Sequence, residues 1–195
     1  MHVQCRQFVE SVKDRYPDHF FNKRVLECGS LWVNGGIKDL FTAGAYTGVD
    51  VIKGENVNVV CPVHLLEFPD KHFDTVISTE MLEHDMYWIG SISKMQRMVK
   101  PGGLLILTCA APGRGEHGTA DHAPHSSGTS QIGNEPWAKY YRPLTQNDFL
   151  AVLDMDEFVA HEFKTNEQVS GGTAAGTDLY FYGLKRGTLD QAACI

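Results

Sequence analysis

The sequence predicts an α/β fold built on a doubly wound, mostly parallel sheet. Short apolar segments that suit buried strands alternate with segments of helical periodicity, in four or five such units. The strand predicted at residues 73–78 is almost continuously apolar, as expected for a parallel strand that is buried on both faces. Ligands of such sheets bind at the carboxyl ends of the strands, so polar residues at those ends are candidate site residues.

Composition limits the class of protein. The 195 residues suit one domain, 1–195, and the ordinary hydrophobic content of 43% suits a globular core. The net charge of −7 argues against a nucleic-acid partner, and the absence of a long apolar run argues against a membrane partner. The five cysteines form no C-x-x-C pair, which favours a reduced, cytoplasmic protein; the oligomeric state is left open.

The first half of the chain contains the strongest local pattern. Within an N-terminal segment, 1–20, an amphipathic helix is predicted from His2 to Tyr16. A strand at 24–28 then leads through a glycine turn at Gly29 and 35–36 into a predicted helix that ends near residue 43. Further strands are predicted at 46–50, which ends in an acid, and at 57–60. Strand, glycine turn and helix together favour a nucleotide-like ligand.

The second half continues the alternation. A helix is predicted at 88–99, with Ile89 among its core positions, followed by a turn at 100–103 and a buried strand at 104–108. A capping-box-like start at Thr145 precedes a short helix that includes Leu150. Two buried strands follow at 158–164 and 178–185, joined by residues 170–176, and 187–195 form a tail.

Four polar or thiol side chains stand at predicted strand ends and are expected to meet in one crevice: Glu27, Asp50, Ser78 and Cys109. An acid that ends the second strand can accept hydrogen bonds from both hydroxyls of a ribose. The alternative interpretation of Asp50 is a turn or helix cap.

Four motifs, at residues 25–29, 46–50, 73–84 and 98–107, occur in the order and spacing of class I S-adenosylmethionine-dependent methyltransferases. The chain resembles the methyltransferase type 11 group, well over residues 24–110 and more loosely at 114–118 and 140–145. The resemblance implies a Rossmann-like, seven-stranded sheet with a final antiparallel strand, and S-adenosyl-L-methionine as cofactor.

The resemblance also implies roles for single residues. Glu27 and Gly29 would line the methionine end of the cofactor, and Asp50 would bind the ribose. Val63 and His64 would flank the adenine, and Ser78 and Thr79 would lie beneath the sulfonium. The chain departs from the family in its glycine loop, where Ser30, Asn34 and Gly35 would form a variant cofactor loop, and at Pro62, where many members carry an acid that meets the adenine amino group.

Residues 111–142, here called the insertion, form an acceptor-side loop in this interpretation, because a long loop after a core strand lies at the mouth of the crevice. If the acceptor is a hydroxyl, a base must remove its proton, and His117 is the first candidate, followed by His84. Three further residues are candidate acceptor contacts: His122, Tyr140 and Tyr141. Glu116, His117 and residues 121–125 also offer metal-ligand types, but their spacing matches no recognised pattern, so no metal is assigned.

Other functions remain open at this point. A nicotinamide dehydrogenase would also use Asp50, but its glycine fingerprint is absent. The main hypothesis is methyl transfer to a small acceptor, with an oxygen of a sugar or metabolite as the candidate acceptor atom. A non-catalytic scaffold or binding protein that keeps the fold is the alternative, and a macromolecular acceptor is a third.

Overall fold

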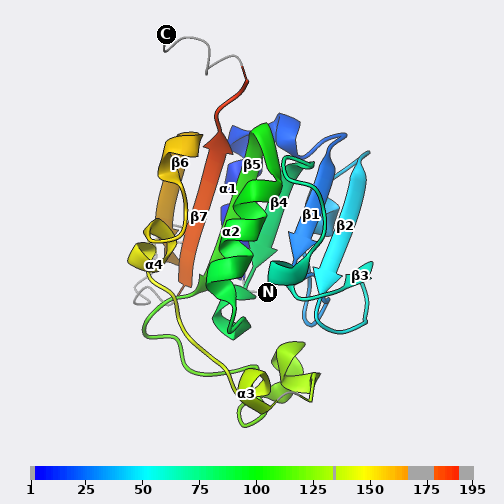
Figure 1. Cartoon of the computed structure of the whole chain (residues 1–195), viewed down its shortest axis with the longest axis vertical. Helices are drawn as coiled ribbons and strands as arrows, with labels where there is room; N and C mark the ends of the chain where they lie inside the picture. The colour runs from blue at the N-terminus through cyan, green and yellow to red at the C-terminus, as the bar shows by residue number, and fades with distance from the viewer. Residues whose placement is uncertain (1–2, 134, 167–177, 189–195) are drawn as a thin grey trace.

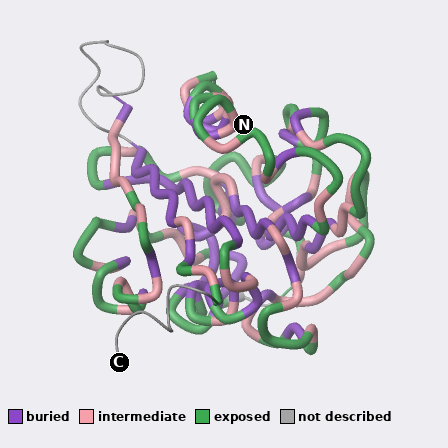
Figure 2. The backbone as a smooth tube through the Cα atoms, turned by 90° about the horizontal axis from the view of Figure 1, so that it is seen from above, coloured by how far each residue is buried: buried purple, intermediate pink, exposed green. Residues whose placement is uncertain are grey.

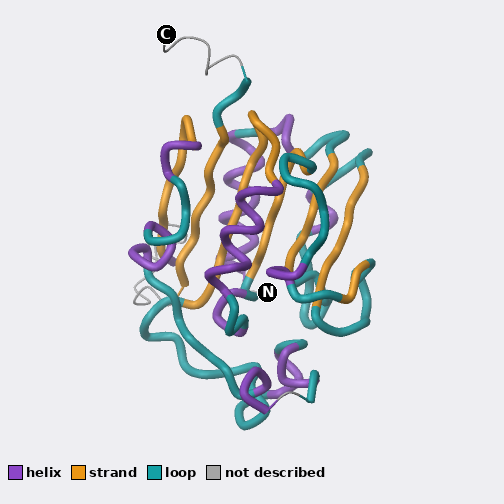
Figure 3. Tube along the Cα trace, viewed as in Figure 1, coloured by secondary structure: helices purple, strands orange, loops and turns teal. Residues whose placement is uncertain are grey.

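The described residues, 3–133, 135–166 and 178–188 of this computed structural model, form one seven-stranded sheet with the order β3-β2-β1-β4-β5-β7-β6 (Figures 1 and 3). The strands are β1 (Arg24–Cys28), β2 (Ala45–Asp50), β3 (Val59–Val60), β4 (Phe73–Thr79), β5 (Val99–Ala110), β6 (Phe158–Thr165) and β7 (Asp178–Lys185). Strands β1 to β5 pair in parallel, whereas β7 is antiparallel to both of its neighbours. The predicted fold class is confirmed, including the antiparallel final strand.

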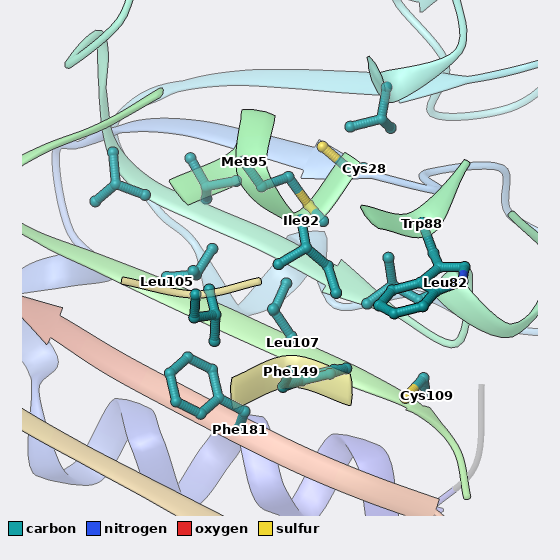
Figure 4. Close-up of a cluster of buried hydrophobic side chains, with 14 of the residues drawn as sticks. Cys28, Leu82, Trp88, Ile92, Met95, Leu105, Leu107, Cys109, Phe149 and Phe181 are labelled. Atoms are coloured by element: carbon teal, nitrogen blue, oxygen red, sulfur yellow. The ribbon is translucent and has the colours of Figure 1, made fainter. Parts of the chain in front are cut away.

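Helices cover both faces of this sheet. On one face lies α1 (Val3–Arg15), and on the other lie α2 (Trp88–Met98) and α4 (Gln146–Leu150) (Figure 1). Successive strand residues point to opposite faces. Leu104 and Ile106 therefore pack in the α1 layer, and Leu105 and Leu107 pack in the α2 layer, where Figure 4 shows them beneath Ile92. The strands at the centre of the sheet are accordingly buried along most of their length (Figure 2).

The helix predicted after the glycine turn is wrong. Between β1 and β2 the chain forms only a single 3-10 turn, η2 (Lys38–Leu40). The helical spacing of Ile37 and Leu40 reflects burial, since both side chains are in the core. The stretch is bounded by two glycines and by Ala43, whose φ of +55° is left-handed and ends any right-handed helix at that point.

Other boundaries differ from the prediction. Strand β3 is shorter than predicted, and the expected turn at 100–103 belongs to β5, where the pairing with β4 shifts register between Phe73 and Thr75. Gly102 has a φ of +73°, and such backbone favours glycine and suits a local irregularity of a strand.

Ile89, a predicted core position, and β6, a predicted buried strand, are more exposed than expected. Ile89, at 57% exposure, lies on the outer side of α2, and Leu150 is exposed at the end of α4. Strand β7 is buried as predicted, but β6 is only half-buried because it is the edge strand of the sheet. The capping box at Thr145 is confirmed: its side chain accepts a hydrogen bond from the Asp148 backbone, and Asp148 accepts one from the Thr145 backbone.

The insertion lies beyond the carboxyl ends of the parallel strands, at the bottom of Figure 1. It contains η5 (Pro124–Ser126), η6 (Thr129–Gln131) and the short α3 (Glu135–Ala138). Trp137 connects it to the segment that follows β4, since the indole N–H donates to the His84 carbonyl over 2.9 Å. The predicted joint at 170–176 and residues 189–195 of the predicted tail lie outside the described residues. None of the helices in the described ranges has the length and apolar character to span a membrane.

Candidate functional site

A cleft opens at the carboxyl ends of β1, β2 and β4, as expected for a parallel sheet. It encloses about 870 Å³, including the open space at its mouth. Its walls come from the loops that follow these strands, from Cys61 and Val63 after β3, and from residues 126–129 of the insertion.

Glu27, near the end of β1, forms part of the cleft floor. Its Oε2 atom accepts hydrogen bonds from the Tyr46 hydroxyl at 2.9 Å and from the Asn56 side-chain amide at 2.6 Å. Burial raises the pKa of Glu27 to about 7, although these two donors oppose the rise. Because both donors contact the same oxygen atom, Oε1 can still accept a hydrogen bond from a ligand.

Asp50, at the end of β2, faces the same cleft. Its two carboxylate oxygens accept hydrogen bonds from the backbone N–H groups of Leu31, at 3.0 Å, and Val51, at 2.7 Å. Burial raises its pKa, and these backbone donors oppose the rise. The insertion covers this carboxylate closely: a Cβ atom added to Gly128 would lie 2.7 Å from Asp50 Oδ1.

Both the backbone conformation and the close neighbour Met81 require a glycine after β1. Gly29 has a φ of +79°, and a Cβ atom there would lie 2.5 Å from the Cβ atom of Met81. The loops after β1 and β4 therefore touch. Thr79, at the end of β4, lines the cleft beside Met81.

Most of the other predicted cofactor residues also line the cleft: Ser30, Asn34, Gly35 and Val63. Two predicted residues do not. Ser78 is fully buried in β4. His64 stacks on the Tyr87 ring, with centroids 4.2 Å apart, outside the lining residues.

The two predicted catalytic histidines lie together. Their rings are perpendicular with centroids 5.1 Å apart, and the ring of Tyr141 lies 5.4 Å from His84 and 5.1 Å from His117. Of the three, only His84 lines the cleft. Burial, with smaller contributions from His117 and Arg114, lowers the pKa of His84 to about 3, so its imidazole is neutral at neutral pH.

The other two predicted acceptor contacts are not brought to the cleft. His122 is exposed, and its Nδ1 atom lies 3.1 Å from a carboxylate oxygen of Glu116. Tyr140 packs against the core on the α2 side of the sheet.

Several cleft residues were missed by the sequence reasoning. Met81 and Asp85 line it from the loop after β4, Asp85 accepting hydrogen bonds from the Ser91 hydroxyl and the Tyr87 backbone. Their position directly after a strand end was an available signal, because that segment faces the ligand edge in a parallel sheet. The contact of residues 126–129 with the cleft depends on the path of the insertion, for which the sequence carries no comparable signal.

Comparison with known proteins agrees with this geometry. A family model described as a methyltransferase domain matches residues 28–107, which run from the end of β1 into β5. No curated protein matches the chain in sequence.

Solved structures are similar in fold. One is the 1,6-didemethyltoxoflavin-N1-methyltransferase of Burkholderia thailandensis with bound 1,6-didemethyltoxoflavin and S-adenosylhomocysteine. Its TM-score is 0.60 at 15% identity, and the match covers 93% of this chain and 78% of that one. A S-adenosylmethionine-dependent methyltransferase of Archaeoglobus fulgidus has a TM-score of 0.57 at 17% identity, covering 92% and 94%.

A third structure is phosphoethanolamine N-methyltransferase 2 of Haemonchus contortus in complex with S-adenosyl-L-methionine, with a TM-score of 0.60 at 15% identity. The match covers 92% of this chain but about half (52%) of that one. At these identities the likeness establishes the fold. The chain is therefore similar to S-adenosylmethionine-dependent methyltransferases in fold, and similar to the methyltransferase domain family in sequence over residues 28–107.

Proposed function

We propose that this chain binds S-adenosylmethionine in the cleft and transfers its methyl group to a small-molecule acceptor, with an acceptor oxygen as the favoured class. The observation that carries the proposal is the pair of carboxylates, Glu27 and Asp50, that adjacent strand ends hold on the same cleft. The close approach of the Gly29 loop supplies the bare backbone that such a ligand contacts.

The cofactor fits these residues by chemistry. The Asp50 carboxylate, already fixed by two backbone donors, accepts hydrogen bonds from the ribose hydroxyls. The free lone pairs of Glu27 accept from the ammonium group at the methionine end, and that positive charge favours the ionised carboxylate. Val63 contacts the adenine, beside Pro62, and Thr79 lies near the sulfonium; Ser78 and His64 support this wall from outside the cleft.

The transfer is an in-line displacement. An acceptor oxygen attacks the methyl carbon, the carbon–sulfur bond breaks, and its electron pair stays on sulfur to give S-adenosylhomocysteine. The acceptor hydroxyl must also lose its proton. The low pKa of His84 makes it a weak proton acceptor at neutral pH, so His117 is the better candidate base and His84 a hydrogen-bonding partner.

The insertion supplies the acceptor side. Trp137 lines the cleft, and Tyr141 lies against both histidines, so an acceptor between them would contact two aromatic rings and two imidazoles. His122 and Tyr140 lie outside the residues that line the cleft, so they are not assigned to the acceptor here. The four described cysteines are free thiols, which supports a reducing, cytoplasmic setting.

The experiment uses S-adenosylmethionine that carries a deuterated methyl group, incubated with the purified chain and a fractionated small-molecule extract. We expect label to appear in one class of small molecule, together with S-adenosylhomocysteine, and we expect Asp50→Ala to abolish both. If the cofactor binds but neither product forms above the Asp50→Ala background, the chain is a binding scaffold. Pro62, which replaces an adenine-reading acid of the resembled family, is the observation that favours that alternative.

A further inference from the structure

A buried carboxylate without a hydrogen bond of good geometry lies next to the histidine pair. Glu83 is fully buried in the 3-10 turn η4 (Leu82–His84). The backbone N–H groups of Glu83 and Ala110 act favourably on its carboxylate, but neither carboxylate oxygen has a hydrogen-bond partner of good geometry among the described residues. Its backbone is fixed, because its carbonyl accepts from the Arg142 N–H over 2.8 Å. A buried carboxyl group is costly, whether ionised or protonated, when its polar atoms have no good partner, so Glu83 offers polar atoms that a bound ion could satisfy.

The side chains around Glu83 are also unsatisfied. His84 is buried, and its Nδ1 atom has no hydrogen-bond partner in the described structure; the same holds for the buried hydroxyl of Tyr141. One ligand atom each from Glu83, His84 and His117 lie within 4.8 Å of one another. Ligand atoms from η4, which carries Glu83 and His84, and from the insertion, which carries His117, therefore converge on one point beside the cleft.

His117 has the orientation of a metal ligand. Its Nδ1 atom lies 3.0 Å from the Gly115 carbonyl oxygen, and the tautomer that donates this hydrogen bond leaves Nε2 with a lone pair for an ion. Hydrogen bonds of this kind orient ligating imidazoles in metal sites. Gly118 lets the loop approach: its φ is +62°, and a Cβ atom there would lie 2.6 Å from His84 Cε1.

We propose that Glu83, His84 and His117 bind one divalent transition-metal ion at the edge of the cleft. Two imidazoles and one carboxylate suit zinc, iron, cobalt or manganese, and three protein ligands leave a position open for a water or an acceptor oxygen. Ligands about 2.1 Å from an ion are roughly 3–3.5 Å apart. Binding therefore draws the three side chains closer together, and half-buried His117, in its loop, is the ligand with room to move.

The ion also has an electrostatic reason to be there. Glu80, three residues earlier and half-buried, adds a second carboxylate whose charge acts unfavourably on Glu83. A divalent cation offsets this repulsion, because it brings positive charge to a site of low dielectric constant.

The site gives the proposed reaction a specific acceptor class, and this part rests on the proposed function. His84 belongs both to the cleft wall and to the metal site, so an acceptor hydroxyl on the ion would lie next to the cofactor. The ion lowers the pKa of that hydroxyl, and its proton passes to solvent. The resulting oxyanion attacks the methyl carbon, and the electron pair of the broken bond goes to sulfur. In the metal-bound enzyme His117 is then a ligand and not the base.

The test is titration of the chelator-treated full chain with Co²⁺, followed by visible absorption, and then displacement with Zn²⁺. We expect one Co²⁺ per chain with a ligand-field spectrum of low coordination number. Loss of an outer partner of a metal ligand weakens binding by about 10–100-fold, so His117→Ala and Glu83→Gln, which remove a direct ligand, should weaken it by more than about 100-fold.

The matched control is His122→Ala, a histidine of the same insertion that pairs with Glu116 and lies outside the cluster. It should bind Co²⁺ as the wild type does. The proposal is overturned if the wild type shows no stoichiometric binding, if His117→Ala binds equally well, or if His122→Ala is the variant that loses the ion. Binding of S-adenosylhomocysteine by each variant shows that it is folded, and separates failure of the metal site from failure of the cofactor site.

Discussion

Glu27→Gln should make the cofactor-free protein more stable at alkaline pH while weakening the proposed cofactor site. Burial raises the pKa of Glu27 from 4.5 to about 7. At 1.36 kcal/mol per pKa unit, this corresponds to at most about 3 kcal/mol. Because the pKa is higher in the folded state, the carboxyl binds more protons when folded than when unfolded between these two values. The free energy of unfolding that it contributes therefore falls as pH rises from 4.5 to 7.

The neutral amide of Gln removes this pH dependence and keeps an oxygen that accepts from Tyr46 and Asn56. Urea unfolding at about pH 4 and about pH 8 measures the pH dependence of the free energy of unfolding. We expect the variant to gain up to about 3 kcal/mol relative to the wild type between the two pH values. Glu67→Gln, at an exposed position, is the control and should show no such gain. A difference between Glu27→Gln and wild type that does not change with pH would refute the reasoning.

Two further predictions concern local structure. In Gly29→Ala the new side chain lies on a left-handed backbone and contacts Met81. We therefore expect the free energy of unfolding to fall by more than the roughly 1–3 kcal/mol that backbone strain alone would cost. Gly133 has a φ of +69°, and a Cβ atom added there would have no neighbour within 4 Å, so Gly133→Ala measures the backbone strain alone. If urea unfolding shows equal losses of stability in the two variants, the contact with Met81 does not contribute. Thr145→Ala removes the capping bond to Asp148 and should cost about 1 kcal/mol, whereas Thr145→Ser should retain most of it. An equal loss in both variants would show that the cap does not contribute.

The sheet could be predicted because its signals are local. Val25, Leu26, Val76 and Ile77 are apolar on both faces of their strands, and only a sheet covered on both sides buries such runs. The helix after Gly36 could not be excluded in the same way, because Ile37 and Leu40 are buried at a spacing that fits either a helix or a turned loop.

The strand-end residues of the cleft and the histidine cluster beside it also differ in how far the sequence predicts their position. Glu27, Asp50 and Thr79 end parallel strands, so topology alone brings them to one edge. Glu83 and His117 are brought together by the path of the insertion, and no periodicity in the sequence specifies that path. The family match also ends at residue 107, before the insertion begins.

The most direct test of the account is calorimetric titration of the purified chain with S-adenosylmethionine, S-adenosylhomocysteine and NAD, repeated on Asp50→Ala and on Asp14→Ala. Asp14 is an exposed residue of α1 and serves as the matched control. The account predicts that the first two ligands bind at one site per chain, that NAD does not bind, that Asp50→Ala loses the binding and that Asp14→Ala retains it. No binding of either methyltransferase ligand by the folded wild type, or equal binding by Asp50→Ala, would contradict the claim that this cleft is the cofactor site.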